Sequence, residues 1–220
     1  MIDVFWPPPT TLSSSSCEIP DLVGKKYWLL INAGRRDKNA MSVIRELNNI
    51  KDFYKKYTLV IVGNIQNTII EDEISNNPNV YQFNYVSRQE LEWLYEKASL
   101  FIYPSFAEGF GLPPVEAMKY GTPVLASATS SIMEVCGDAV MYFCPYSILE
   151  LRARLYYLLE HGTEAIRRKP LERYNNILDR QKNDLQSVIL RILDFNICSM
   201  PRGYTSDAGQ PRGVSLQEKA

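Results

Sequence analysis

Histidine is nearly absent from this chain, and long apolar runs are missing altogether. The single histidine, His161, stands at the predicted end of a helix before Gly162, where we expect it to face water. One histidine excludes a multi-histidine metal centre, and a Ser-His-Asp triad would have to rest on this one position. No apolar run is long enough to span a bilayer, and the first residues do not resemble a secretory signal. We therefore expect a cytoplasmic protein.

Cysteine is also rare, and the charge is balanced. No Cys-x-x-Cys pair occurs among the 4 cysteines, Cys17, Cys136, Cys144 and Cys198. Reduced thiols are therefore favoured over a disulfide framework or a zinc site. A net charge of -1 gives no reason to expect nucleic acid as a partner. With 220 residues, 45% of them hydrophobic, the chain is long enough for one or two packed cores.

Two common nucleotide-binding motifs are missing. The sequence contains no Walker loop and no Gly-x-Gly-x-x-Gly, because Gly109-x-Gly111 is followed by Leu-Pro-Pro. A nicotinamide or flavin dinucleotide fold is therefore disfavoured.

Strand-like and helical segments alternate along the chain. The apolar, strand-like runs are 27–32, 58–63, 80–85, 100–103, 123–126 and 139–143. Helical patterns cover 39–57, 88–98, 113–120, 147–160 and 171–195. The helix over 88–98 has a capping-box start at Ser87. Only a short turn is expected around 132–135. The tyrosines at 156 and 157 are expected in the core. This alternation predicts an α/β fold with a doubly wound, parallel, Rossmann-like sheet.

The ends of the chain have a different composition. Residues 1–25 contain three consecutive prolines and a serine run, which indicates a linker or N-terminal extension. Residues 198–220 are rich in Gly, Ser, Pro and charge and are expected to be disordered or derived from cloning. We therefore predict one ligand-binding domain over residues 26–197.

A glycine-rich loop stands where an open parallel sheet binds its ligands, beyond the carboxyl end of a strand. Strand 100–103 leads into Glu108-Gly109-Phe110-Gly111-Leu112, and a helix begins at Pro113. Amide groups of Gly111, Leu112 and Val115 would point out of this helix start, where the helix dipole favours an anion. The loop therefore predicts a site for a phosphorylated ligand.

The loop after the first strand is cationic. It reads Gly34-Arg35-Arg36-Asp37-Lys38-Asn39. Alone, such a loop is more often a solvated turn. Because its strand shares a sheet edge with the glycine-rich loop, we expect its cations to hold a diphosphate, Arg by paired hydrogen bonds and Lys as a point charge.

Glu108 and Glu116 flank the glycine-rich turn. They could be the acid and nucleophile of a glycoside hydrolase, which need carboxyl groups roughly 5 to 9.5 Å apart. A continuous helix would separate them by about 12 Å, so they are better suited to hydroxyl groups at two ends of one ligand. Two surface glutamates are the remaining alternative.

Together these residues resemble a known family. The run from Phe101-Ile102-Tyr103-Pro104-Ser105 through Glu108-Gly109-Phe110-Gly111-Leu112-Pro113 and Glu116-Ala117-Met118 to Gly121-x-Pro123-Val124 is similar to the signature of the retaining glycosyltransferases of family 4. The likeness continues through 131–139 and covers about residues 26–160. It implies one half of the two-domain GT-B fold, namely the C-terminal domain that binds a nucleotide-activated sugar.

The resemblance also implies roles for individual residues. Glu108 would lie beside the transferred sugar and Glu116 would hold the ribose. Arg35 and Lys38 would neutralise the diphosphate, on the loop that begins at Gly34. The backbone of Gly109, Phe110, Gly111 and Leu112 would bind phosphate and sugar oxygens, and the base would lie near Tyr85 and Val86. Transfer would proceed with retention and would need no metal or other cofactor.

The chain departs from this family in two ways. Its Arg and Lys are closer together than is usual, so Arg36 is an alternative phosphate ligand. Too few residues precede Lys26 for an acceptor-binding domain, so we expect that half in cis or in trans, with peripheral membrane association through it. The alternatives are one subunit of a split enzyme, a non-catalytic nucleotide-binding or interaction module, and, less favoured, a nucleotide-sugar epimerase.

Overall fold

The computed structural model describes residues 16–65, 71, 74–167 and 169–198. Its centre is a sheet of six parallel strands in the order β3-β2-β1-β4-β5-β6. The strands are β1 (Tyr27–Ile31), β2 (Thr58–Val62), β3 (Val80–Phe83), β4 (Leu100–Tyr103), β5 (Val124–Ser127) and β6 (Met141–Phe143). The predicted parallel α/β fold is confirmed. The central strands β1, β4 and β5 are buried along their whole length, which explains why they read as continuous apolar runs.

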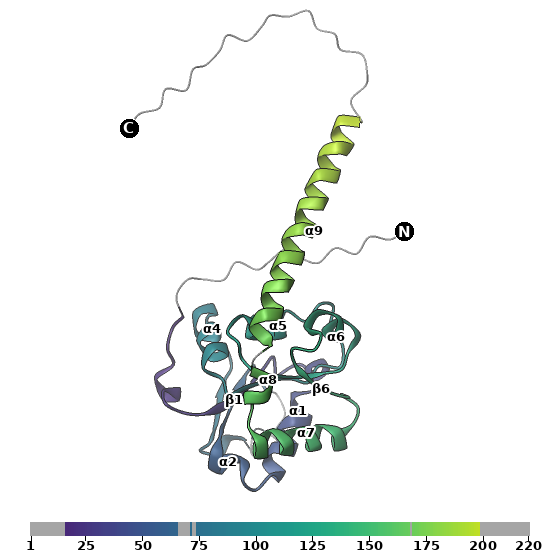
Figure 1. Cartoon of the computed structure of the whole chain (residues 1–220). Coiled ribbons are helices and arrows are strands. Elements are labelled where there is room, and N and C mark those ends of the chain that lie inside the picture. Colours follow the sequence, from purple (N-terminus) through teal and green to yellow (C-terminus); the bar gives the residue numbers. More distant parts are fainter. Residues whose placement is uncertain (1–15, 66–70, 72–73, 168, 199–220) are drawn as a thin grey trace, which may run out of the picture.

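Helices cover both faces of the sheet (Figure 1). One face packs against α4 (Arg88–Lys97), α5 (Leu112–Lys119), α6 (Ser130–Cys136) and the start of α9 (Pro170–Cys198). The other packs against α1 (Ala40–Asn49), α2 (Phe53–Lys56) and α7 (Ile148–His161). Two short 3₁₀ turns, η1 (Pro20–Leu22) and η2 (Arg36–Lys38), and the single turn α8 (Glu164–Arg167) complete the described elements.

Two predicted elements differ in the structure. The expected helix over 39–57 is broken between α1 and α2, at Ile50 to Asp52. Ile50 leaves the helical conformation while it stays in the core, and the turn places Phe53 against Trp28, with ring centroids 5.0 Å apart. The short turn expected around 132–135 is instead the helix α6.

The packed part of the chain also includes residues from the predicted linker. Ile19 and Leu22 lie in the core, and the Cys17 amide donates to the Gln89 carbonyl. Apolar side chains at these two positions fill the space beside α4, whereas the three consecutive prolines and most of the serine run lie earlier, in residues 1–15, outside the described residues.

Candidate functional site

The loops that follow β1 and β4 are held together at the carboxyl edge of the sheet. The carbonyl of Asp37 accepts hydrogen bonds from the Phe106 amide at 2.9 Å and from the Ser105 hydroxyl at 3.2 Å. The hydroxyl of Ser127, at the end of β5, donates to the Ser105 carbonyl at 2.5 Å. These bonds join the cationic loop, the glycine-rich loop and the end of β5 into one frame.

Lys38 and Glu108 meet inside this frame. Lys38 Nζ lies 2.6 Å from Glu108 Oε1, and the two side chains are only 8% and 11% exposed. Tyr103, the last residue of β4, donates its hydroxyl to the same carboxylate oxygen at 2.6 Å. Burial acts to raise the pKa of Glu108, but the hydrogen bonds from Lys38 and Tyr103 outweigh it and hold the pKa below its ordinary value. Glu108 is therefore ionised at neutral pH.

The arginines of the cationic loop are placed differently from Lys38. Arg35 forms paired hydrogen bonds with Asp37, 3.0 Å from Nε and 2.9 Å from Nη2, and its side chain is 67% exposed. Arg36 is exposed, and within the described part of the chain no ion-pair partner is found for it. The loop passes close to the one after β2, because a Cβ on Gly34 would lie 1.9 Å from the Asn64 carbonyl oxygen.

Glu116, on α5, is held by two residues of α4. Arg88 Nη1 lies 2.9 Å from Glu116 Oε1, and the Tyr95 hydroxyl donates to Oε2 at 3.3 Å. Arg88 also pairs with Glu92 at 3.2 Å, which fixes its orientation. The Glu116 side chain is 15% exposed, so one side of the carboxylate still faces the surface.

The turn between the two glutamates has the backbone that an anion site needs. Gly111 is the N-cap of α5 at φ +88°, with Ile132 Cγ1 3.2 Å from where a Cβ would be. Pro113 and Pro114 have no N–H, which leaves the Leu112 and Val115 amides as donors of the first turn. At Gly109 a Cβ would meet nothing within 4 Å, so the loop is open there.

Tyr85 and Val86 follow β3, directly before the N-cap of α4. Tyr85 is 82% exposed, while Val86 packs against the core. The predicted capping box at Ser87 is confirmed, and it starts the helix that carries Arg88 to Glu116. The structure therefore connects the loop expected to meet the base with the carboxylate expected to hold the ribose.

The residues that position the two glutamates could not be identified from the sequence pattern. Tyr103 and Ser131 contact Glu108, the latter by a 2.8 Å hydrogen bond to its carbonyl, and Arg88 and Tyr95 contact Glu116. A polar group at the end of a buried strand was the available signal for Tyr103. Nothing in the local pattern distinguished Arg88 or Tyr95 from ordinary helix residues.

The histidine, the cysteines and the helices can also be compared with what the sequence predicts. His161 is exposed at the end of α7, as expected, and stacks on Tyr157 with ring centroids 4.5 Å apart. The three cysteines that the structure describes with their side chains, Cys17, Cys136 and Cys144, are free thiols, as expected. Among the helices of the described ranges, none combines the length and the apolar character that crossing a bilayer requires.

The fold matches solved glycosyltransferase structures of the GT-B type. Sucrose-phosphate synthase from Thermosynechococcus elongatus superposes with a TM-score of 0.65 and 20% identity, over 79% of this chain and 46% of that one. A glycosyltransferase from Rickettsia africae gives a TM-score of 0.66 and 16% identity, over 82% and 50% of the two chains. These likenesses concern the fold alone.

Sequence comparison gives more closely related proteins. The O-antigen chain mannosyltransferase RfbU of Salmonella typhimurium is 35% identical over 136 residues, which is 57% of this chain and 37% of that protein. The O-antigen chain mannosyltransferase B of Escherichia coli is 43% identical over 76 residues, 34% of this chain and 20% of that protein. This chain thus spans well under half the length of both relatives. Residues 19–176 match the family described as glycosyl transferases group 1, and the chain therefore belongs to that family.

Proposed function

We propose that this chain is the C-terminal donor-binding domain of a retaining glycosyltransferase of family 4 and binds a nucleoside-diphosphate sugar. The observation that carries the proposal is the pair Lys38 and Glu108, 2.6 Å apart although 70 residues separate them in the sequence. A cation suited to a phosphate thus stands against a carboxylate suited to a sugar hydroxyl, at the sheet edge where such folds bind ligands.

Each part of the donor has a matching group. The ribose hydroxyls would bond to Glu116, whose carboxylate is held by Arg88 and Tyr95. The diphosphate would lie on the backbone from Gly109 to Leu112, at the start of α5. The base would lie against the loop that carries Tyr85 and Val86.

Arrival of the diphosphate would change the partner of Lys38. A diphosphate oxygen offers this ammonium a second anionic acceptor, and Glu108 is then available to the sugar hydroxyls. Arg36 has no ion pair to lose among the described residues when it turns to the diphosphate, whereas Arg35 would have to leave Asp37. This difference supports Arg36 as the guanidinium ligand of the diphosphate, with Arg35 as the alternative.

The reaction would be a displacement on one face of the sugar. The bond from the anomeric carbon to the diphosphate oxygen breaks and its electron pair leaves with the diphosphate. The acceptor hydroxyl oxygen bonds to the same face of that carbon, and its proton passes to the departing phosphate oxygen. Lys38 and the arginine stabilise the charge that develops on the diphosphate. That transfer proceeds without a metal remains a prediction.

We further propose that the transferred sugar is a hexose, with mannose as the first candidate. The curated relatives RfbU and mannosyltransferase B are both named as mannosyltransferases, and they are 35% and 43% identical to this chain over the aligned residues. A chemically similar pocket would also take glucose, so both sugars belong in a binding test.

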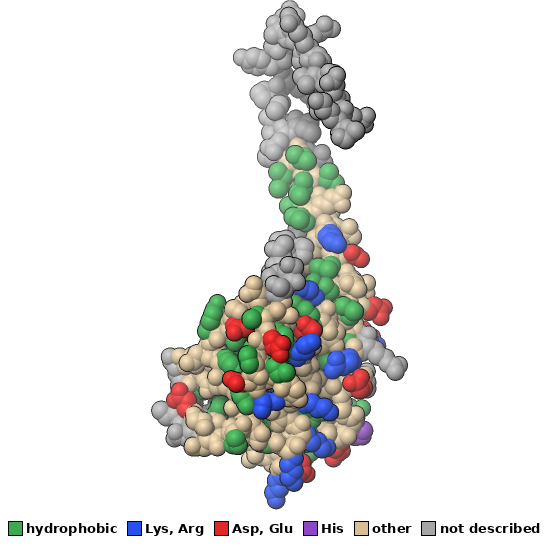
Figure 2. Space-filling view, turned by 90° about the vertical axis from the view of Figure 1, so that its left-hand side faces the viewer, with side chains coloured by type: hydrophobic (Ala, Val, Ile, Leu, Met, Phe, Trp, Pro, Cys, Tyr) green, Lys and Arg blue, Asp and Glu red, His purple; other side chains and the backbone are tan. Residues whose placement is uncertain are grey.

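The acceptor half would dock against α9. This helix projects from the body of the molecule (Figure 1), and Figure 2 shows hydrophobic side chains along it. We call five of them the α9 apolar stretch, each of them 43–56% exposed: Leu185, Ile189, Leu190, Ile192 and Leu193. An exposed aliphatic surface of this kind favours a protein partner, in cis or in trans. Any membrane association through that partner is part of this proposal.

Calorimetry tests the donor proposal. The chain is titrated with guanosine, uridine and adenosine diphosphates, free and linked to mannose or glucose. We expect one of the nucleotides to bind, and Glu116→Gln to weaken it by about tenfold or more, because the neutral amide is a poorer acceptor for ribose hydroxyls. Glu172→Gln, on the exposed start of α9, is the matched control that leaves binding unchanged.

The outcomes separate the candidate functions. Absence of binding by every nucleotide in the panel contradicts the proposal. Donor binding, followed by transfer when an acceptor half is added, supports a donor domain or a split enzyme. Donor binding without transfer favours the non-catalytic nucleotide-binding module.

A further inference from the structure

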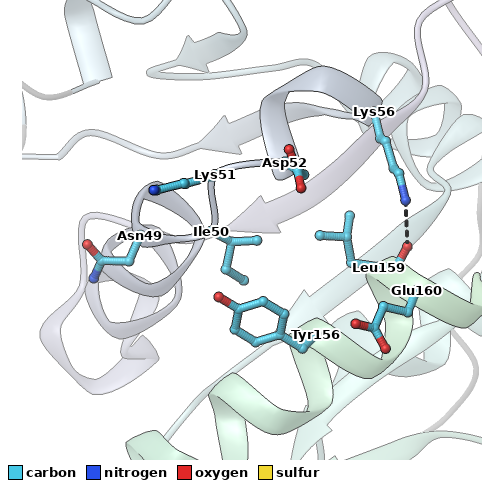
Figure 3. A pocket seen from close by; sticks show the side chains of 8 residues that line it. All are labelled: Asn49, Ile50, Lys51, Asp52, Lys56, Tyr156, Leu159 and Glu160. Carbon is cyan, nitrogen blue, oxygen red and sulfur yellow. Dashed lines mark hydrogen bonds between the residues drawn. The ribbon is translucent and has the colours of Figure 1, made fainter.

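A pocket outside the proposed donor site lies between α1, α2 and the end of α7 (Figure 3). Its volume is about 360 Å³, within the range of small-molecule sites. We call it the α1–α7 pocket, and its lining residues are Asn49, Ile50, Lys51, Asp52, Lys56, Tyr156, Leu159 and Glu160. It is distant from the donor site along the strands, because Lys56 stands two residues before Thr58, the first residue of β2, and so marks the amino edge of the sheet.

The pocket has an apolar base and an aromatic wall. Ile50 and Leu159 are 3% and 7% exposed and form the base, and the Tyr156 ring stands beside Ile50 in Figure 3. The prediction that Tyr156 and Tyr157 lie in the core is wrong, because each is 43% exposed. The two have different surroundings: Tyr157 is stacked on His161, whereas Tyr156 faces the pocket. An exposed ring face beside a cavity is a platform for the apolar face of a ligand.

The polar groups around this platform cancel in charge. Two ammonium groups and two carboxylates line the pocket, those of Lys51, Lys56, Asp52 and Glu160. Lys56 already donates to the Leu159 carbonyl at 3.3 Å, and Asp52 accepts from Lys55 at 2.8 Å. A pocket for a phosphate would show an excess of cations, and a pocket for a metal ion would show an excess of oxygen anions. This lining suits a neutral ligand that both donates and accepts hydrogen bonds.

Sugars have this chemistry, since one face of the ring presents C–H groups and the edges present hydroxyls. Carboxylates and the Asn49 carbonyl oxygen would accept from the hydroxyls, while ammonium groups and the Asn49 amide would donate to them. We propose that the α1–α7 pocket is a second carbohydrate site, which binds a mono- or disaccharide unit of a glycan with Tyr156 as its platform. That this glycan is part of the acceptor chain rests on the proposed function.

Nuclear magnetic resonance of the full isotope-labelled chain tests this site. The probes are mannobiose, mannotriose and maltotriose, with inorganic phosphate as the anion probe. We expect a mannose oligosaccharide to shift the backbone amide signals of residues 49–52 and 156–160 in fast exchange. Tyr156→Ala weakens this binding by about tenfold or more, whereas Tyr157→Ala, with the same exposure on the same helix, leaves it unchanged.

Three results would overturn the proposal: no shifts with any oligosaccharide, equal binding by the Tyr156→Ala variant, or shifts with phosphate alone. Calorimetric titration of the same samples with the nucleotide panel measures the affinity of the donor site separately. Tyr156→Ala leaves nucleotide binding unchanged, so a failed glycan site and a failed donor site give different results.

Discussion

At the residue scale, the ion pair of Lys38 and Glu108 contributes to the free energy of unfolding, and the same two side chains are proposed to bind the donor. Both side chains are nearly buried, and Tyr103 donates a further hydrogen bond to the carboxylate. We predict that Lys38→Met lowers the free energy of unfolding at pH 7 by about 2–3 kcal/mol, because a buried carboxylate loses its counter-charge while the tyrosine hydrogen bond remains. Urea denaturation measures this loss.

Glu108→Gln and the double variant complete a mutant cycle. The double variant should be more stable than Lys38→Met, since no buried charge is left without its partner. The stabilisation from the lowered pKa of Glu108 is fully present above its unfolded pKa and is lost as pH falls through the lower folded pKa. The coupling measured in the cycle should therefore disappear in acid. A coupling that is the same at pH 7 and in acid contradicts this assignment.

Residue types and their loops could be read from the sequence, but their mutual contacts could not. The expectation that Glu108 and Lys38 share one sheet edge followed from the order of strands and loops. That Lys38 bonds to Glu108, while Arg35 bonds to Asp37, depends on the path of two loops whose backbone bonds form only in the folded molecule. Tyr95 reaches Glu116 through the packing of α4 against α5, which no local pattern encodes.

At the element scale, periodicity predicted which segments are regular but not where one of them breaks. Val43, Ile44, Leu47 and Ile50 continue one apolar stripe up to the break between α1 and α2. Because Ile50 is buried whether or not the helix continues there, the stripe is the same for a straight helix and a broken one. The packing of Phe53 on Trp28 decides between them.

The glycines of the loop before α5 give an element-scale prediction. Gly111 has φ +88° and faces Ile132, so Gly111→Ala combines backbone strain with a tight contact. We expect it to lower the free energy of unfolding by about 1–3 kcal/mol and to displace the start of α5. Thermal denaturation measures the loss of stability. Calorimetry measures the weaker nucleotide binding that we expect from a displaced start of α5.

Gly109→Ala is the matched control in the same loop. A Cβ at Gly109 would meet nothing within 4 Å, so we expect stability to change by less than about 0.5 kcal/mol. Equal destabilisation by the two substitutions would contradict the role given to the Gly111 conformation.

At the scale of the whole molecule, the α9 apolar stretch presents five exposed aliphatic side chains on one helix. Ile189 and Ile192 are each about half exposed, so replacing both with Lys should change the free energy of unfolding by less than about 0.5 kcal/mol. The same double variant should reduce self-association of the isolated chain at high concentration, because the α9 apolar stretch is interrupted. Sedimentation velocity measures this.

Leu149→Lys is the control for that experiment. Leu149 is 75% exposed but lies on α7, outside the α9 apolar stretch. It should leave sedimentation unchanged. If the Ile189→Lys/Ile192→Lys variant has the same sedimentation coefficient as the unchanged chain at every concentration, the α9 apolar stretch is not the surface through which the chain associates.

The bonds among Asp37, Ser105, Phe106 and Ser127 have a further consequence for the thermodynamics of binding. Loops that are already cross-bonded lose little conformational entropy when a ligand arrives. Most of the favourable enthalpy of the phosphate contacts would then remain in the binding free energy. The entropic cost would fall on the donor itself, whose rotatable bonds become fixed against a surface that hardly moves.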